Sequence, residues 1–264
     1  MIPIALTIAG SDPGGGAGIQ ADLKVFHQLG VFGTSAVTLI TVQNSTRMSR
    51  VELLDPRLVS EQIDAVLEDF PPQAAKTGAL GNAAIVASIA SRSFPCPLVV
   101  DPVMRGKHGA PLLDSAAGEA LRDFLLPKAT LLTPNIEEAA LLAGVPVADA
   151  DQMRHAAARI TELGARSVLI KGGHLEGPEF RHETLDILYH DGVFTELRAP
   201  RLDTRHTHGT GCAYSAAITA YLARGLGMPE AVRRAHRFVH EAIRTNPGLG
   251  AGAGPLNYWA DDSL

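Results

Sequence analysis

The stretch Thr204-Arg-His-Thr-His-Gly-Thr-Gly-Cys212, followed by Ala213-Tyr-Ser-Ala-Ala-Ile-Thr-Ala220, predicts a glycine turn that opens a long helix. Gly209 and Gly211 permit backbone conformations that bulkier residues avoid. The alanines favour a helix, whose apolar stripe is formed by Ala216, Ala217, Ala220 and Tyr221. We therefore expect free N–H groups at the start of this helix to converge on one point, where the helix dipole favours an anion such as phosphate.

Cys212 stands at the start of the same helix, a position that stabilises a thiolate and lowers its pKa. Such a thiol can accept the proton of a substrate hydroxyl. Gly209, Thr210 and Gly211 would then stabilise charge that develops on a transferring phosphoryl group. A second interpretation remains open, in which the glycines only allow close packing and Cys212 is a small apolar residue.

Length and composition limit the classes of protein that this chain can belong to. Its 264 residues allow one large α/β domain, and we predict a single domain over residues 1–264. The net charge of −5 and the absence of a basic run argue against binding to nucleic acid or a membrane surface. Two cysteines without metal-ligand spacing fit a reducing compartment. The first nine residues resemble a strand rather than a signal peptide, so we expect a cytoplasmic protein.

Short apolar runs alternate with helical patterns along the whole chain. The predicted strands are Ile4–Ala9, Thr34–Val42, Ala74–Lys76, Leu98–Asp101, Ala129–Leu132 and Ser167–Lys171, and a hairpin of Thr184–Tyr189 and Val193–Leu197. The predicted helices are 19–29, 57–70, 82–91, 115–124, 136–143, 151–163, 211–224 and 229–245. Alternation of this kind predicts βαβ units and a mostly parallel sheet that is covered on both faces.

Polar residues follow six of these strands directly. They are Gly10-Ser-Asp12, Gln43-Asn44, Lys76-Thr-Gly78, Asp101-Pro-Val-Met104, Thr133-Pro-Asn135 and Lys171-Gly-Gly-His174. In open parallel sheets, ligands bind beyond the carboxyl ends of the strands. We therefore expect these segments to form the rim of an active site.

The N-terminal glycine loop matches a loose dinucleotide fingerprint, Gly16-Ala-Gly18-Ile-Gln-Ala21. That fingerprint requires an acidic residue near the end of the second strand, yet residues 23–51 contain neither Asp nor Glu. A P-loop motif is also absent from the sequence, so we favour a loop that approaches a small polar ligand. Asp22 either bonds that ligand or is an ordinary acid in the first helical turn.

Several side chains near the strand ends have two possible roles. The amide of Gln43 can pair with an aminopyrimidine edge, or it is a solvated strand end. Asp101 can orient Mg²⁺ through water, or it caps the next turn. Asn135 and Glu138 form a helix cap, which could also hold a metal-bound water beside a triphosphate. Lys171 can reach a phosphate, or it is a surface residue.

The spacing of His206 and His208 is compatible with zinc, but the sequence supplies no third ligand, and we do not expect a zinc site.

Six segments, read together, resemble the hydroxymethylpyrimidine/phosphomethylpyrimidine kinases of thiamine biosynthesis, which belong to the ribokinase-like superfamily. These segments are Ala9–Lys24, Val42–Asn44, Asp101–Met104, Thr133–Ala139, Lys171–His174 and Thr207–Cys212. The resemblance implies a three-layer α/β/α sandwich and a homodimer. It also implies two successive phosphorylations that depend on ATP and Mg²⁺, first of the hydroxymethyl group of the pyrimidine and then of the resulting monophosphate.

The resemblance also assigns residues. Gln43 matches the pyrimidine-binding glutamine, and Asp22 the acid that lines the same pocket, to which we add Gly10. Gly209–Gly211 match the anion hole, and Cys212 the catalytic base. Asn135 and Glu138 match the metal motif of the superfamily. We further assign Lys171, Asn135 and Thr207 to ATP and its phosphates, and Asp101 with Glu138 to the metal.

Two positions depart from the family pattern. The run Lys76-Thr-Gly-Ala79-Leu80 has alanine where the family usually has a methionine that packs on the substrate ring, and His206 replaces a usual asparagine. The smaller side chain leaves room beside the ring, so a pyridoxal-type kinase is the alternative within the superfamily. A non-catalytic pyrimidine-binding regulatory protein is the alternative from another class, although the anion hole, base and metal motif disfavour it.

Overall fold

The computed structural model describes residues 2–106, 109 and 112–261, and its nine strands form one sheet in the order β3-β2-β1-β4-β5-β6-β7-β8-β9. The strands are β1 Ile4–Ser11, β2 Phe32–Gln43, β3 Met48–Leu53, β4 Ala74–Thr77, β5 Leu98–Val100, β6 Leu131–Leu132, β7 Ser167–Lys171, β8 Glu183–His190 and β9 Val193–Pro200. The six central strands, β2-β1-β4-β5-β6-β7, pair in parallel, whereas β3, β8 and β9 pair antiparallel with their neighbours. The predicted mostly parallel sheet is confirmed.

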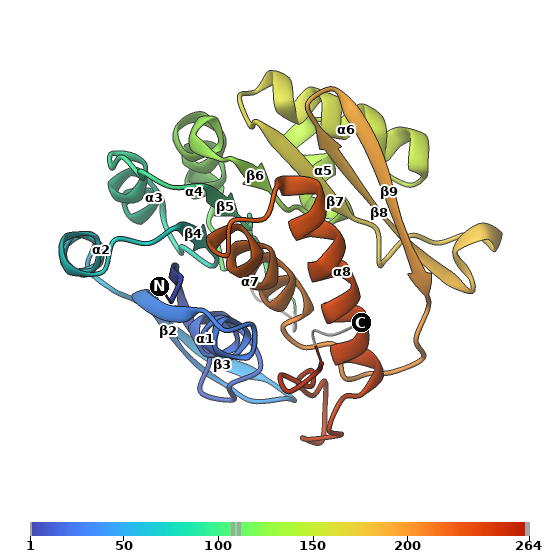
Figure 1. Ribbon diagram of the computed structural model, residues 1–264, viewed down its shortest axis with the longest axis horizontal. Helices are drawn as coiled ribbons and strands as arrows, with labels where there is room; N and C mark the ends of the chain where they lie inside the picture. The colour runs from blue at the N-terminus through green and yellow to red at the C-terminus, as the bar shows by residue number, and fades with distance from the viewer. Residues whose placement is uncertain (1, 107–108, 110–111, 262–264) are drawn as a thin grey trace.

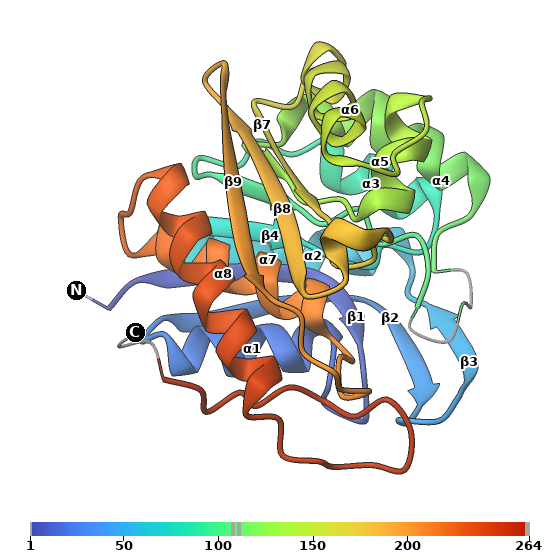
Figure 2. The same ribbon diagram turned by 90° about the vertical axis from the view of Figure 1, so that its right-hand side faces the viewer.

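The helices cover both faces of this sheet (Figure 1, Figure 2). They are α1 Gly18–Gln28, α2 Pro56–Asp69, α3 Ala83–Ala90, α4 Ser115–Ala120, α5 Ile136–Ala143, α6 Ala150–Glu162, α7 Thr210–Ala223 and α8 Met228–Arg244. Helices α2 to α6 supply one apolar core, and α1, α7 and α8 supply a second core on the opposite face. The expected three-layer α/β/α arrangement is therefore present.

Three differences from the predicted elements have physical causes. Strand β3 was not expected, because its residues Met48–Leu53 are mostly exposed and lack an apolar pattern. The predicted helix 115–124 is α-helical only to Ala120 and continues as a π-helical turn, Leu121–Leu125, and a short 3-10 turn, Leu126–Lys128. A further 3-10 turn spans Pro178–Phe180.

Helix α7 does not have the expected apolar stripe, because it is buried on all sides. Ser215 and Thr219 are as completely buried as the alanines of this helix. The cause is its place in the fold, since α7 packs on the sheet with α1 on one side and α8 on the other (Figure 1). None of the described helices is both long and apolar enough to cross a bilayer.

Candidate active site

The turn before α7 requires glycine at position 209. Gly209 caps the helix with φ of 82°, and a Cβ there would overlap the carbonyl oxygen of Gly16 in the N-terminal glycine loop. Thr210 turns its N–H and its hydroxyl back to the carbonyl of Thr207, at 3.3 and 2.9 Å. The two glycine loops, far apart in the sequence, therefore touch at the start of α7.

The next two N–H groups of α7 are available to a ligand. Ala213 is the first residue to donate along the helix, to the carbonyl of Gly209 at 2.8 Å. No acceptor within the described part of the chain receives the N–H of Gly211 or Cys212. A Cβ on Gly211 would lie 3.3 Å from the Lys171 ammonium nitrogen, so this helix start and Lys171 share one space. The geometry fits the predicted anion hole.

Lys171 is held at the ends of three neighbouring strands. Its Nζ lies 3.0 Å from Oδ1 of Asp101, which also accepts the hydroxyl of Thr133 at 3.2 Å. The second oxygen of Asp101 accepts the hydroxyl of Ser215 on α7 at 3.3 Å. Burial by itself lowers the pKa of Lys171, but Asp101 and Glu138 raise it overall. Lys171 is thus a charged group of the candidate site rather than a surface residue.

Asn135 and Glu138 form the expected cap and also stand beside Lys171. Asn135 Oδ1 accepts the Glu138 N–H at 2.9 Å, and Glu138 Oε2 accepts the Asn135 N–H at 2.8 Å. Asn135 pairs with Lys171 in a short parallel bridge. Burial raises the pKa of Glu138 to about 7. The charge of Asp101 also raises this pKa, whereas the charge of Lys171 lowers it. Burial therefore opposes ionisation of the Glu138 carboxyl unless further positive charge is present.

The residues present fit a magnesium ion that is shared with a nucleotide. The described residues contain no group of three or more His, Cys, Asp or Glu side chains that could hold a metal alone. Mg²⁺ commonly uses one or two carboxylates together with water and phosphate oxygens. Asp101 and Glu138 supply that number of carboxylates.

Cys212 differs from expectation in its acidity. Burial raises the pKa of its thiol to about 11, while Lys76 and the Gly18 N–H act in the opposite direction. The predicted low pKa is therefore wrong for the protein without substrate. The effect of the helix terminus, which lowers the pKa, is outweighed by burial of the thiol. The nearby carboxylates of Asp22 and Asp101 raise the pKa further.

Asp22 holds a buried lysine instead of facing a ligand. One oxygen lies 2.7 Å from Lys76 Nζ, and the other accepts the hydroxyl of Thr7 at 2.6 Å. Both side chains of the ion pair are fully buried. Burial alone lowers the pKa of Lys76, but Asp22, Cys212 and Asp101 raise it overall. Both oxygens of Asp22 are thus engaged within the protein, and its expected contact with substrate stays a prediction.

Lys76 is a functional candidate that the sequence interpretation missed. It was expected at the rim, yet it is enclosed within β4 and influences the acidity of Cys212. A signal was available, because a lysine inside the short apolar run Ala74-Ala-Lys-Thr77 requires a buried acid as its partner.

The N-terminal glycine loop satisfies its own N–H groups. Asp12 accepts hydrogen bonds from Gly14, Gly16 and Ala17 at 2.8 to 3.0 Å. Oδ2 of Asp12 also lies 2.9 Å from Nε2 of His208, which joins this loop to the turn before α7. Burial raises the pKa of Asp12, but His208 and the N–H groups of Gly14 and Gly16 outweigh it, so the pKa lies below its usual value. An internal carboxylate thus occupies the place that an external anion would take.

Gly10, Gln43 and His206 lie outside the hydrogen-bonded group of Asp101, Thr133 and Lys171. Gly10 is buried in β1, where a Cβ would collide with Leu39 of β2, and its expected role in substrate binding stays a prediction. Gln43 ends β2 opposite Met48, and among the described residues no hydrogen bond joins its side chain to the cluster. The ring of His206 packs against Gly254, and its buried Nδ1 has no partner within the described ranges.

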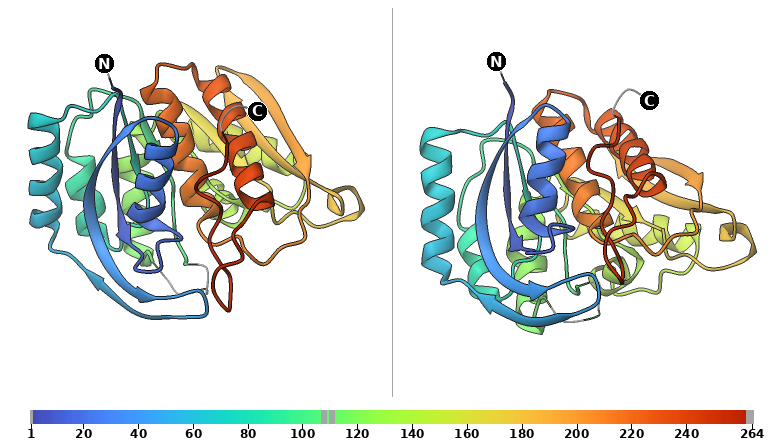
Figure 3. Two further views of the ribbon diagram at one scale, coloured as in Figure 1. Left: turned by 60° about the horizontal axis from the view of Figure 1, so that its bottom comes forward. Right: turned by 90° about the horizontal axis from the view of Figure 1, so that it is seen from below.

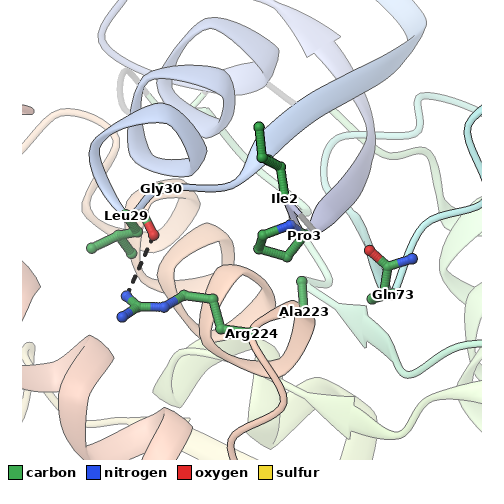
Figure 4. A pocket seen from close by; sticks show the side chains of 7 residues that line it. All are labelled: Ile2, Pro3, Leu29, Gly30, Gln73, Ala223 and Arg224. Atoms are coloured by element: carbon green, nitrogen blue, oxygen red, sulfur yellow. Dashed lines mark hydrogen bonds between the residues drawn. The ribbon is translucent and has the colours of Figure 1, made fainter.

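A separate pocket of about 530 Å³ lies far from these residues, at the opposite end of β1 and α7 (Figure 4). It is lined by Ile2, Pro3, Leu29, Gly30, Gln73, Ala223 and Arg224. Arg224 donates a hydrogen bond to the carbonyl of Leu29 at 3.4 Å across this pocket. The polar strand ends do not contribute to it, so we do not identify it with the candidate active site.

Comparison with known proteins gives the family. The sequence model described as phosphomethylpyrimidine kinase matches residues 12–257. The chain belongs to this family. It is 44% identical over 259 residues to the hydroxymethylpyrimidine/phosphomethylpyrimidine kinase of Bacillus subtilis, covering 97% of this chain and 94% of that protein.

Two further relatives extend the comparison. The thiamine biosynthesis bifunctional protein ThiED of Geobacter sulfurreducens is 45% identical over 96% of this chain, which spans about half (51%) of that longer protein. The pyridoxal kinase of Staphylococcus aureus, solved with AMP-PCP and pyridoxal, superposes with a TM-score of 0.89. It is 36% identical, and the alignment covers 98% of this chain and 94% of that one. The ribokinase-like fold expected from the sequence is confirmed.

Proposed function

We propose that this protein transfers the terminal phosphoryl group of ATP to the hydroxymethyl group of 4-amino-5-hydroxymethyl-2-methylpyrimidine, and then phosphorylates the monophosphate to the diphosphate. This places it in thiamine biosynthesis, in agreement with the names of its relatives. The observation that supports this most strongly is the space shared by the Gly211 and Cys212 N–H groups and the Lys171 ammonium. Donors fixed in advance of the reaction stabilise a transferring phosphoryl group without further reorganisation.

The chain's own residues divide the chemistry between them. The N–H groups of Gly211 and Cys212, together with Lys171, bind the phosphoryl oxygens, while Asn135 and Thr207 position ATP. Cys212 takes the proton of the substrate hydroxyl, and the Lys76 ammonium stabilises the thiolate that results. Gln43 pairs with the aminopyrimidine edge. Asp101 and Glu138 would hold Mg²⁺, which supplies charge neutralisation between the phosphates.

A second candidate substrate is pyridoxal, which has a hydroxymethyl arm on an aromatic ring. It is favoured by the likeness to the S. aureus pyridoxal kinase and by the small side chain at Ala79. The carbonyl of Ala79 accepts the hydroxyl of Thr38 at 2.6 Å, which fixes its backbone against β2.

A coupled ADP-release assay discriminates between these functions. We expect turnover with the pyrimidine and with its monophosphate, and a lower kcat/KM with pyridoxal. Ala79→Met should reduce pyridoxal turnover further by filling the room beside the ring, with Ala83→Met on α3 as the matched control. Pyridoxal as the better substrate would replace the proposal with a pyridoxal kinase. No ADP release with any of the three compounds would indicate the non-catalytic binding protein.

We also propose a cytoplasmic homodimer. The two unpaired cysteines, Cys96 and Cys212, suit a reducing compartment. Ile40 and Val42, on the same side of the β2–β3 hairpin, are 47% and 53% exposed, and apolar side chains of this kind are common in subunit contacts. Sedimentation velocity should give a dimer mass for the native chain and a monomer for Ile40→Glu, whereas a native monomer would contradict the assembly.

A further inference from the structure

The glycine-rich C-terminal segment, residues 246–260, is hydrogen-bonded to the turn between β2 and β3 and to both glycine loops. Figure 2 and Figure 3 show this segment in dark red, running from the end of α8 past the lower side of the molecule. Ala253 donates to the carbonyl of Ser45 in the β2–β3 turn at 2.9 Å, and His208 donates to the carbonyl of Gly254 at 3.1 Å. The segment therefore links the hairpin that carries Gln43 with the turn before α7.

Tyr258 anchors this segment between the two glycine loops. Its hydroxyl donates to the carbonyl of Gly16 at 2.7 Å, and its side chain is almost fully buried. A Cβ on Gly209 would overlap that same carbonyl oxygen and would lie 3.0 Å from the Tyr258 hydroxyl. The Tyr258 hydroxyl is thus located at the point where the loop before α1 meets the loop before α7.

The position of this contact matters for the transfer of a phosphoryl group. The loop before α1 leads to Gly18, whose N–H donates toward the Cys212 thiol. The loop before α7 leads to Gly211 and the anion hole. A displacement of about 1 Å between an acceptor group and a phosphoryl site lowers rates on the order of 100-fold. The Asp12–His208 pair joins the two loops directly, and the Tyr258 hydroxyl adds a hydrogen bond from the C-terminal segment at the same junction.

We propose that Tyr258 is a positioning residue for phosphoryl transfer, which fixes the spacing of the two glycine loops through the carbonyl of Gly16. The C-terminal segment is then part of the catalytic framework rather than a loose end. This inference rests on the proposed function. Burial raises the pKa of the phenol well above its usual value, so the hydroxyl remains a donor across the working pH range.

The test is the substitution Tyr258→Phe, which removes the hydroxyl and keeps the ring beside the Lys24 ammonium, 5.3 Å from its centre. Trp259→Phe is the matched control, because Trp259 is the next residue on the same segment and is 75% exposed. We expect kcat for the pyrimidine to fall about 10-fold in Tyr258→Phe, with KM for ATP changed less than two-fold. The melting temperature should fall by only about 2–4 °C, as expected for one lost hydrogen bond.

Each outcome decides between the inference and its alternatives. A Tyr258→Phe enzyme with kcat within two-fold of the native value overturns the positioning role, as does an equal loss in Trp259→Phe. A rise in KM for ATP in proportion to the loss of kcat also overturns it, because that result indicates general disturbance of the site. If the native chain itself phosphorylates none of the compounds, the proposed function fails and this inference fails with it.

Discussion

The thiol of Cys212 lies between groups that act on its acidity in opposite directions. Burial and the carboxylates of Asp22 and Asp101 raise the pKa, to about 11, whereas the Lys76 ammonium and the Gly18 N–H lower it. A base with this pKa is protonated near neutrality in the free enzyme. Under the proposed mechanism, proton abstraction by Cys212 should therefore become more effective as the pH rises.

The first prediction concerns this pH dependence. Native kcat/KM for the pyrimidine should still be rising at about pH 9, because the thiolate fraction increases toward a pKa of about 11. Cys212→Ser should lower kcat by about 10² to 10⁴-fold and remove that rise, since a hydroxyl has no accessible anion there. Cys96→Ser, the other free cysteine, serves as the control. A fully active Cys212→Ser enzyme would exclude the cysteine as the base.

A second prediction at this scale concerns Glu138 and stability. Its pKa is raised from 4.5 to about 7, so the folded state binds more protons than the unfolded state between these values. The free energy of unfolding therefore falls as the pH rises from about 4.5 to about 7, by up to about 3 kcal/mol. Glu138→Gln removes this titration and can keep the cap. The unfolding free energy of the variant should therefore rise relative to that of the native chain as the pH rises.

Urea unfolding at pH 5 and at pH 8, in buffer with a metal chelator, checks the Glu138 prediction. Glu137→Gln is the matched control, because Glu137 is the neighbouring acid and is exposed. The difference in unfolding free energy between Glu138→Gln and the native chain should be more favourable to the variant at pH 8. The same difference at both pH values would rule out a raised pKa for Glu138.

At the scale of elements, the start of α7 leaves little room for a side chain at Gly211. A Cβ on Gly211 enters the space beside Lys171 and Asp101, at 3.3 and 3.7 Å. Gly211→Val should therefore lower kcat by about 10²-fold or more while the protein stays folded. Gly173→Val, in the loop after Lys171 where a Cβ meets no neighbour, is the control. Activity of Gly211→Val within a few-fold of the native enzyme would show that no phosphoryl group binds there.

The buried ion pair between α1 and β4 gives a prediction for stability. Asp22→Asn leaves the Lys76 ammonium enclosed without a charge partner, which should lower the unfolding free energy by about 3–5 kcal/mol. The double variant Asp22→Leu with Lys76→Met should recover much of that loss. Glu61→Gln, which breaks the exposed pair with Arg57, should cost less than about 1 kcal/mol. Chemical unfolding measures all three variants, and an unchanged Asp22→Asn would refute the charged pair.

Sequence patterns predicted the elements wherever periodicity and end signals agreed. Helix α5 begins and ends as expected, with Asn135 as its cap and Gly144 in a left-handed conformation at φ of 66°. Strand β3 could not be predicted in this way, because it is formed by pairing with β2 and its side chains remain largely in solvent. The π-helical turn after Ala120 buries Leu121 and Leu125, and no end signal in the sequence marks its start.

Part of the candidate site could also be predicted, because the ends of parallel strands meet at one edge of the sheet. Asp101 follows β5, Lys171 ends β7, and Asn135 with Glu138 begins the helix after β6, so the strand ends indicate that these residues gather at one edge. The partner of Asp22 could not be read from spacing, because Asp22 and Lys76 belong to different βαβ units. The acidity of Cys212 likewise depends on burial, which no local pattern reports.

At the scale of the whole molecule, the sheet brings one site together from segments across the chain. Asp101, Thr133 and Lys171 come from the ends of β5, β6 and β7, and α7 adds Gly211 and Ser215 more than 30 residues later. The C-terminal segment then crosses back to the N-terminal glycine loop at Tyr258. The candidate site therefore joins residues from both halves of the chain.

The most direct test of this account follows the products of a single reaction. The purified chain is incubated with hydroxymethylpyrimidine, ATP and Mg²⁺, and ³¹P NMR with mass spectrometry identifies each phosphorylated pyrimidine over time. We predict that the monophosphate appears first and is then converted into the diphosphate, with one ADP released at each step. A pyrimidine that stays unphosphorylated, while pyridoxal in a parallel reaction is converted to its phosphate, would contradict the account.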